Sequence, residues 1–155
     1  MKKIKLYLDT TILNFIFADD SPEERKATQH FFRQVYLFDV FISDVVMREV
    51  SRCPEAKQNK LVELIDQHGL EILDFNGEAD ELAEAYIKNG IIPIRYRDDA
   101  NHIAVASVNN CDVLLSWNFK HIVKVKTKRE VAGINLLKGY NPIDIYTPRE
   151  VIEDV

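Results

Sequence analysis

Short apolar runs alternate with longer amphipathic segments along the 155 residues of the chain. The runs are rich in strand-forming residues and predict five strands, at residues 3–8, 41–43, 70–73, 112–116 and 143–146. Serine, proline and glycine mark the ends of the helical segments, which fall at residues 21–35, 54–69, 77–90, 98–110, 127–137 and just after 148. Strands that alternate with such helices need crossover connections. We therefore expect an α/β fold in which a mostly parallel five-stranded sheet is flanked by helices.

Length and composition predict one domain over residues 1–155, because 46% hydrophobic and 29% charged residues are typical of a globular protein. The longest apolar runs, such as residues 113–115, fall far short of the roughly 20 residues that a membrane helix needs. The charged N-terminus reaches Asp9 before any signal-like apolar core. We expect a cytoplasmic protein that does not enter the membrane.

The net charge of -5 at first disfavours a nucleic-acid partner, but the basic residues are unevenly distributed. Residues 119–129 contain no acid and hold Lys120, Lys124, Lys126, Lys128 and Arg129. Arg95 and Arg97 stand just before a pair of aspartates. Such a run is either a solvated helix face or a phosphate-binding surface, and the pattern alone does not decide between them.

Polar side chains directly follow two of the predicted strands. In parallel sheets functional groups gather beyond the carboxyl ends of strands, where the strand order reverses. Asp9 follows the first strand at the start of a helix, a position where aspartate also serves as an N-cap. Ser116 and Asn118 follow the fourth strand in the same way. We expect these two strand ends to face each other.

A second acid, Glu49, lies on the edge of the apolar side of the helix that follows the second strand. A glutamate seldom points inward without a partner. The alternative is a rim residue that pairs with Arg48 or Arg52 or is simply solvated.

The third acid, Asp99, shares a helical face with Ile103 and Ala106 in a largely apolar helix. A carboxylate on a buried face needs a cation or strong hydrogen-bond donors. We expect Asp98 to cap this helix, although a contribution to the site stays open, and His102 to be a hydrogen-bonded second-layer or core histidine.

Brought together, Asp9, Glu49, Asp99 and Asn118 would form a site that offers only oxygen ligands and concentrates negative charge. Such a site needs cations, and hard ions such as Mg²⁺ or Mn²⁺ suit it because histidine and thiolate are not in the set.

The sequence resembles the PIN-domain nuclease family from about Lys3 to Pro148. The resemblance rests on the order and spacing of "LDTTI", "SDVVMREV", "DDANHIAVA" and "LLSWNFKHI". It implies a Rossmann-like sheet, three or four acids that hold divalent metal, and cleavage of single-stranded or structured RNA. Carried over by position, the metal-binding and catalytic acids are Asp9, Glu49 and Asp99. The fourth acid of the family falls at Asn118, where this chain departs from the pattern.

The small size of the chain is similar to that of VapC-type toxins of bacterial toxin–antitoxin pairs. This analogy implies RNA as substrate, a cognate antitoxin as partner and a homodimer as an oligomeric state to test. Phosphodiester hydrolysis needs a nucleophile near neutral pH and positive charge next to the phosphate oxygens. A water bound to a divalent cation supplies the nucleophile, and the cation itself supplies the charge. Hydroxyl groups that are candidates for binding the phosphate or a water are Thr10, Thr11 and Ser116, although both threonines also suit a helix start. Cations that are candidates for guiding the RNA backbone are Arg97, Lys120 and Lys124.

Other functions remain open on the sequence alone. If Asn118 marks a decayed metal site, the chain is a catalytically weak or inactive RNA-binding protein of the same fold. A magnesium-binding phospho-acceptor signalling domain could use Asp74 after the third strand, but no lysine follows the last strand. A phosphatase with Asp9 as nucleophile would need a second acid where Thr11 stands.

Overall fold

The computed structural model describes residues 2–152 and contains a parallel sheet of five strands in the order β3-β2-β1-β4-β5. The strands are β1 (Lys5–Leu8), β2 (Asp39–Ser43), β3 (Glu71–Leu73), β4 (Val113–Leu115) and β5 (Asp144–Tyr146). The predicted α/β fold and its parallel sheet are confirmed. Each strand lies within two residues of its predicted bounds, because the apolar runs that define the strands are short and sharply bounded.

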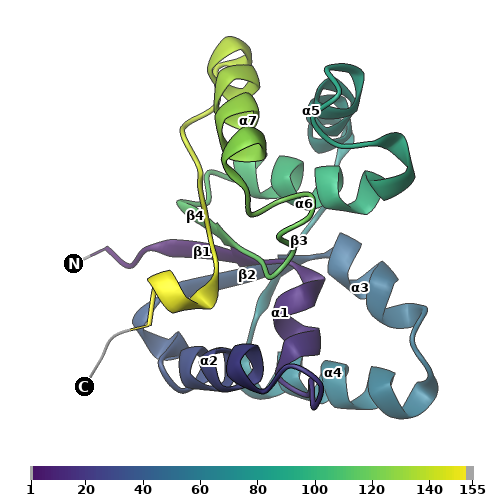
Figure 1. The fold of residues 1–155 in the computed structure, drawn as a ribbon, viewed down its shortest axis with the longest axis vertical. Coiled ribbons are helices and arrows are strands. Elements are labelled where there is room, and N and C mark those ends of the chain that lie inside the picture. The colour runs from purple at the N-terminus through teal and green to yellow at the C-terminus, as the bar shows by residue number, and fades with distance from the viewer. Residues whose placement is uncertain (1, 153–155) are drawn as a thin grey trace.

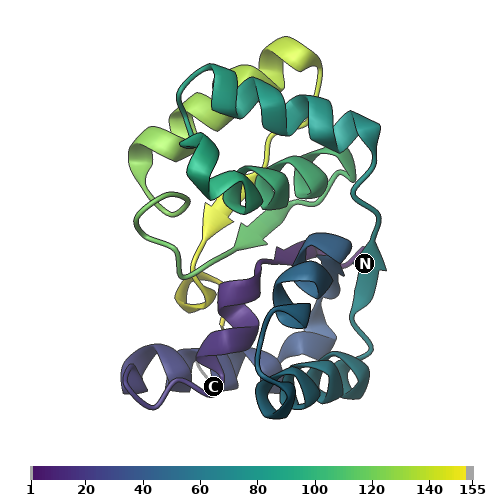
Figure 2. The ribbon, with the colours of Figure 1, turned by 90° about the vertical axis from the view of Figure 1, so that its right-hand side faces the viewer.

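Helices cover both faces of the sheet (Figure 1). On one side lie α1 (Thr10–Phe15), α2 (Pro22–Arg33), α3 (Asp44–Ser51) and α4 (Glu55–His68). On the other side lie α5 (Gly77–Lys88), α6 (Arg97–Val108) and α7 (Val125–Lys138). Single 3-10 turns occur at η1 (Val35–Leu37), η2 (Ile94–Tyr96) and η3 (Pro148–Glu150). The view turned by 90° shows the same three layers (Figure 2). None of the helices in residues 2–152 is long and apolar enough to cross a membrane.

Alternate residues of the central strands face opposite helical layers, as the two-residue period of a strand requires. Tyr7 and Leu114 pack in the core beneath α5, α6 and α7. Leu6, Leu8 and Leu115 pack in the second core with α1 to α4. Burial on both faces explains why these strands read as continuous apolar runs.

The strand order reverses at β1, which pairs with β2 on one side and with β4 on the other. Leu8 lies opposite Leu115, and the amide of Asp9 donates to the carbonyl oxygen of Leu115 at 3.2 Å. The carboxyl ends of β1 and β4 therefore lie side by side, as expected. Residues that directly follow these two strands are brought together at the switch point of the sheet.

Candidate active site

Asp9 is the N-cap of α1 and is also a buried acid at the switch point. Its Oδ1 accepts hydrogen bonds from the amide and the hydroxyl of Thr11 at 3.0 and 2.5 Å, and its Oδ2 accepts from the Ser116 hydroxyl at 2.5 Å. Only 2% of Asp9 is exposed. The residue that caps α1 is thus also a buried acid at the switch point, and Thr11 and Ser116 hold its carboxylate in place.

Glu49 points from α3 toward the same end of the sheet. Its Oε1 accepts from the hydroxyl of Thr10 at 2.9 Å and from Nε2 of His102 at 2.5 Å. Arg52, one of the alternative partners, pairs instead with Asp98 at 3.0 Å. Glu49 therefore makes its polar contacts with Thr10 and His102 and forms no ion pair with Arg48 or Arg52 in the described structure. The prediction that Asp98 caps α6 is wrong, because α6 begins at Arg97 and the Asp98 carboxylate instead accepts from Arg52, the residue that follows α3.

A buried chain of hydrogen bonds holds His102, the partner of Glu49, in place. Nδ1 of His102 and the Tyr7 hydroxyl lie 2.7 Å apart, and the Tyr7 hydroxyl lies 2.7 Å from Oγ of Ser43. The prediction that His102 is a hydrogen-bonded second-layer or core histidine agrees with its burial and its contacts with Tyr7 and Glu49. Tyr7 and Ser43 were missed by the sequence analysis, although a tyrosine inside a buried strand signals that its hydroxyl needs a partner.

Asp99 projects from the first turn of α6 and is held by Asn118. The side-chain nitrogen of Asn118 donates to Oδ2 of Asp99 at 3.1 Å, while its oxygen accepts from the amide of His121 at 3.0 Å. The backbone amide of His121 is only a donor, so it fixes which end of the Asn118 side chain is the oxygen. The structure thus brings Asn118 into the site with its donor end, not its oxygen, facing the acid.

Electrostatics separate the three acids. Burial raises the pKa of Asp9, and burial raises the pKa of Asp99 to about 6. Burial acts in the same direction on Glu49, but the hydrogen bond and charge of His102 outweigh it and lower the pKa of Glu49. Burial disfavours the charged form of His102, yet the hydrogen bond to Glu49 and the nearby carboxylates raise its pKa. His102 therefore compensates Glu49, whereas Asp9 and Asp99 have no ion pair among residues 2–152.

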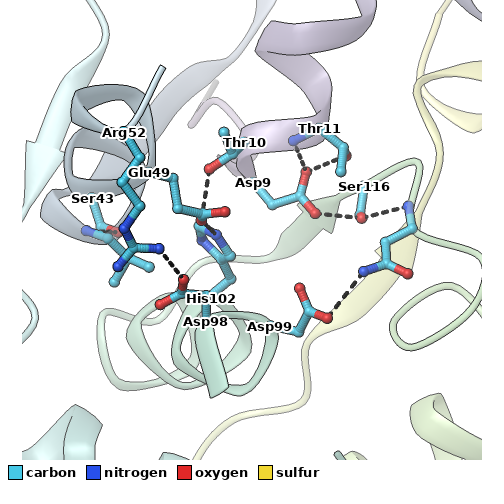
Figure 3. Close-up of polar contacts among 12 residues, drawn as sticks. Asp9, Thr10, Thr11, Ser43, Glu49, Arg52, Asp98, Asp99, His102 and Ser116 are labelled. Atoms are coloured by element: carbon cyan, nitrogen blue, oxygen red, sulfur yellow. Dashed lines mark hydrogen bonds and ion pairs between the residues drawn. The ribbon is translucent and has the colours of Figure 1, made fainter. Parts of the chain in front are cut away.

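The carboxylates of Asp9, Glu49 and Asp99 lie around one common space in the close-up view (Figure 3). Within the described part of the chain, no three histidine, cysteine, aspartate or glutamate side chains are close enough to hold one ion together. The donor set nevertheless fits a hard cation, since Mg²⁺ keeps several waters and is often bound through only one or two carboxylates. Asp9 and Asp99, the two acids without an ion pair, are the donors best suited to that role.

The cations predicted to guide a substrate lie in two different environments. Arg97 lines the same pocket as Glu49 and Asp99, but its guanidinium donates to Glu84 at 2.6 Å and to Asp80 at 2.9 Å, both on α5. Lys120 and Lys124 are exposed and lie in the segment that directly follows Asn118. Of the three predicted cations, these two lysines are the ones that form no ion pair among residues 2–152.

Comparison with protein families finds that the model of the PIN domain matches residues 6–124. Comparison with curated protein sequences finds no match. Among solved structures, the chain is similar to one in DNA-bound VapBC from Salmonella typhimurium, with a TM-score of 0.57 and 17% identity over 94% of this chain and 98% of that one. It is also similar to a chain in VapBC2 from Rickettsia felis bound to a promoter DNA fragment, with a TM-score of 0.54 and 19% identity over 92% and 97% of the two chains. A chain of VapBC-5 from Mycobacterium tuberculosis gives a TM-score of 0.52 and 12% identity over 92% and 98%. At these identities the solved structures show a common fold.

Proposed function

The chain belongs to the PIN domain family, and from this membership and the geometry of its site we propose that it is a divalent-metal-dependent ribonuclease. One observation carries the proposal. Asp9 and Asp99 come from separate elements, face the same space as Glu49, have pKa values that burial raises, and form no ion pair among residues 2–152. Carboxylates that lack their own cations favour the binding of a divalent one.

In this proposal Asp9 and Asp99 would hold Mg²⁺ or Mn²⁺, and Glu49 would contribute as a third acid through the water molecules that such an ion keeps. When bound there, such a cation would supply a water of lowered pKa and positive charge next to the phosphate oxygens. The chain's own residues position the acids: Thr11 and Ser116 fix Asp9, and the Asn118 amide fixes Asp99. Thr10 and His102 fix Glu49. The hydroxyl groups that we expected to bind phosphate therefore act on the acids in the structure.

The substrate that we propose is RNA, which the protein would meet in the cytoplasm. The VapBC complexes that contain chains of this fold support an antitoxin as the partner, and with it the role of a toxin in a toxin–antitoxin pair. A homodimer remains a further proposal. The structure offers nothing comparable for a phospho-acceptor domain, because Asp74 is exposed and lies apart from the acids joined at the switch point.

Manganese is expected to raise the melting temperature and to be required for RNA cleavage. A ligand that binds only the folded state at 100 times its Kd stabilises it by about 2.7 kcal/mol, which corresponds to roughly 5–10 °C for a chain of this size. The measurements are thermal melts with and without Mn²⁺ and a cleavage assay on single-stranded RNA, with EDTA as the control. A clear thermal shift without cleavage would favour the alternative of an inactive RNA-binding protein. That alternative is specific to this chain because Asn118 stands where the family has a fourth acid.

Neutralising Lys120 and Lys124 together is expected to weaken RNA binding and to flatten its salt dependence. Removal of one lysine–phosphate interaction reduces the slope of log K against log salt by about 0.7 for a single strand. The double glutamine variant should therefore show a slope that is shallower by roughly 1.4 units. The matched control replaces Lys26 of α2 and Lys57 of α4, two exposed lysines on the layer that carries neither Lys120 nor Lys124. Equal slopes in both variants would mean that residues 119–129 are an ordinary solvated surface.

A further inference from the structure

Two aromatic rings pack against each other at a tilt beside the acids. Tyr96 ends η2, directly before α6, and its ring centroid lies 4.1 Å from that of His121, with 33° between the ring planes. Both residues are half-buried, so part of the pair is exposed. Cζ of Arg95 and Nζ of Lys120 lie over the Tyr96 ring, 5.5 and 5.6 Å from its centre, in cation–π contacts that long exposed side chains can give up to a ligand. The pair is thus an aromatic surface with positive charge around it.

Both rings of the Tyr96–His121 pair lie close to the acids. Tyr96 lines the same pocket as Glu49 and Asp99. The backbone amide of His121 donates to Asn118, whose side chain in turn donates to Asp99. A ligand whose phosphate lies at the acids would therefore have this aromatic pair as a neighbour.

The charge state of His121 suits a stacking role. Partial burial and the nearby charges of Lys120, Lys124 and Arg95 lower the pKa of His121. The imidazole is then neutral at pH 7, and the positive charge at this place belongs to the lysines and the arginine. Planar neutral rings bind bases by stacking, while the cations around them contact the backbone phosphates.

We propose that the Tyr96–His121 pair is a stacking site for one unpaired base of the single-stranded nucleic acid that lies across the acids. The inference rests on the proposed function and adds to it where, and by what contact, the substrate is held. Only an unpaired base is available, because bases in a duplex are already stacked on their neighbours. The site therefore selects single strands over duplexes and tolerates different bases, since every base has a π-face.

The test measures binding of a fluorescently labelled ten-nucleotide RNA by anisotropy in EDTA, where metal-dependent cleavage does not interfere. Tyr96→Leu is expected to weaken binding on the order of tenfold. Tyr96→Phe, which keeps the ring, should bind within about twofold of the original protein. Tyr36→Leu is the matched control, because Tyr36 is 68% exposed and precedes β2, at the end of the sheet opposite the acids.

A second series removes one base at a time from the same RNA. In the original protein one abasic position should cost about as much as Tyr96→Leu, and in the Tyr96→Leu protein that position should cost little more. Equal binding by Tyr96→Leu, equal abasic losses in both proteins, or no binding at all would overturn the proposal. If Tyr96→Leu does not fold, quenching of 2-aminopurine at one position by the original protein supports stacking, and no quenching at any position refutes it.

A separate assay measures cleavage of RNA by the original protein with Mn²⁺, so that the stacking site and the nuclease activity are tested independently. If the protein cleaves RNA while Tyr96→Leu binds normally, the stacking site is wrong and the nuclease stands. If the abasic series supports stacking but no cleavage occurs at any Mn²⁺ concentration, the stacking site stands and the nuclease is wrong.

Discussion

Asp9→Asn is expected to reduce metal-dependent RNA cleavage by at least about a hundredfold, because a divalent cation contributes several kcal/mol to such reactions and each 1.36 kcal/mol is tenfold in rate. Asparagine keeps the volume of the side chain and one oxygen that can accept from Thr11. Its side-chain nitrogen can donate to Oγ of Ser116, an oxygen that already accepts from the backbone N–H of Asn118. The change therefore removes a charge and leaves the packing intact.

The same variant should be at least as stable as the original protein when metal is removed. Burial raises the pKa of Asp9, which means that the folded state disfavours the ionised carboxylate near neutral pH. Asparagine removes this cost. The melting temperature in EDTA should be unchanged or higher, and the increase caused by Mn²⁺ should be reduced or abolished.

Asp74→Asn is the matched control, since Asp74 also follows a strand but is exposed and lies outside the site. It should leave cleavage and the thermal response to Mn²⁺ unchanged. Undiminished cleavage by a folded Asp9→Asn protein would refute the metal-nuclease proposal.

The sequence predicted the sheet and the convergence of Asp9 with Ser116 because both depend on strand ends, which apolar patterning locates well. The positions of Glu49 and Asp99 were harder to predict, since each depends on which face of its helix points inward. The helical period indicated the orientation of the two acids, but it did not indicate their hydrogen-bond partners. In the structure Thr10 binds Glu49 and Asn118 binds Asp99, contacts that join segments 39 and 19 residues apart.

The features that escaped the sequence analysis all depend on tertiary packing. Arg97 stands beside the acids in the sequence, yet its side chain turns to α5, where two carboxylates bind it. The Tyr7 and His102 contact spans 95 residues, and no local pattern encodes such a pair. Tyr96 and His121 likewise meet where Asn118 joins the segment after β4 to the start of α6.

Asn118→Asp is expected to tighten Mn²⁺ binding on the order of tenfold and to lower the melting temperature in EDTA. The amide nitrogen that now donates to Asp99 would become a carboxylate oxygen, while the other oxygen can still accept from His121. Without metal, two carboxylates then face each other, which costs stability. With metal, the added charge strengthens an oxygen-ligand site.

The destabilisation in EDTA should depend on pH in a defined direction. The pKa of Asp99 is raised from 3.8 to about 6, so the folded state holds this proton more tightly than the unfolded state. Stability from this group is present at low pH and disappears as pH rises toward about 6. The melting difference between Asn118→Asp and the original protein should therefore be large at pH 7.5. It should shrink at pH 5, where a protonated Asp99 can donate to the new carboxylate.

Calorimetric titration of Mn²⁺ and thermal melts at both pH values measure these effects. Asn76→Asp is the matched control, because Asn76 caps α5 through an oxygen that aspartate also has, so the change adds a charge without changing the cap. Asn118→Ala should remove the donor to Asp99 without adding a ligand, and its Mn²⁺ affinity should not rise. Equal Mn²⁺ affinity in Asn118→Asp and the original protein would mean that no cation binds between this position and Asp99, and that Asn118 acts only as the hydrogen-bond donor that holds Asp99 in place.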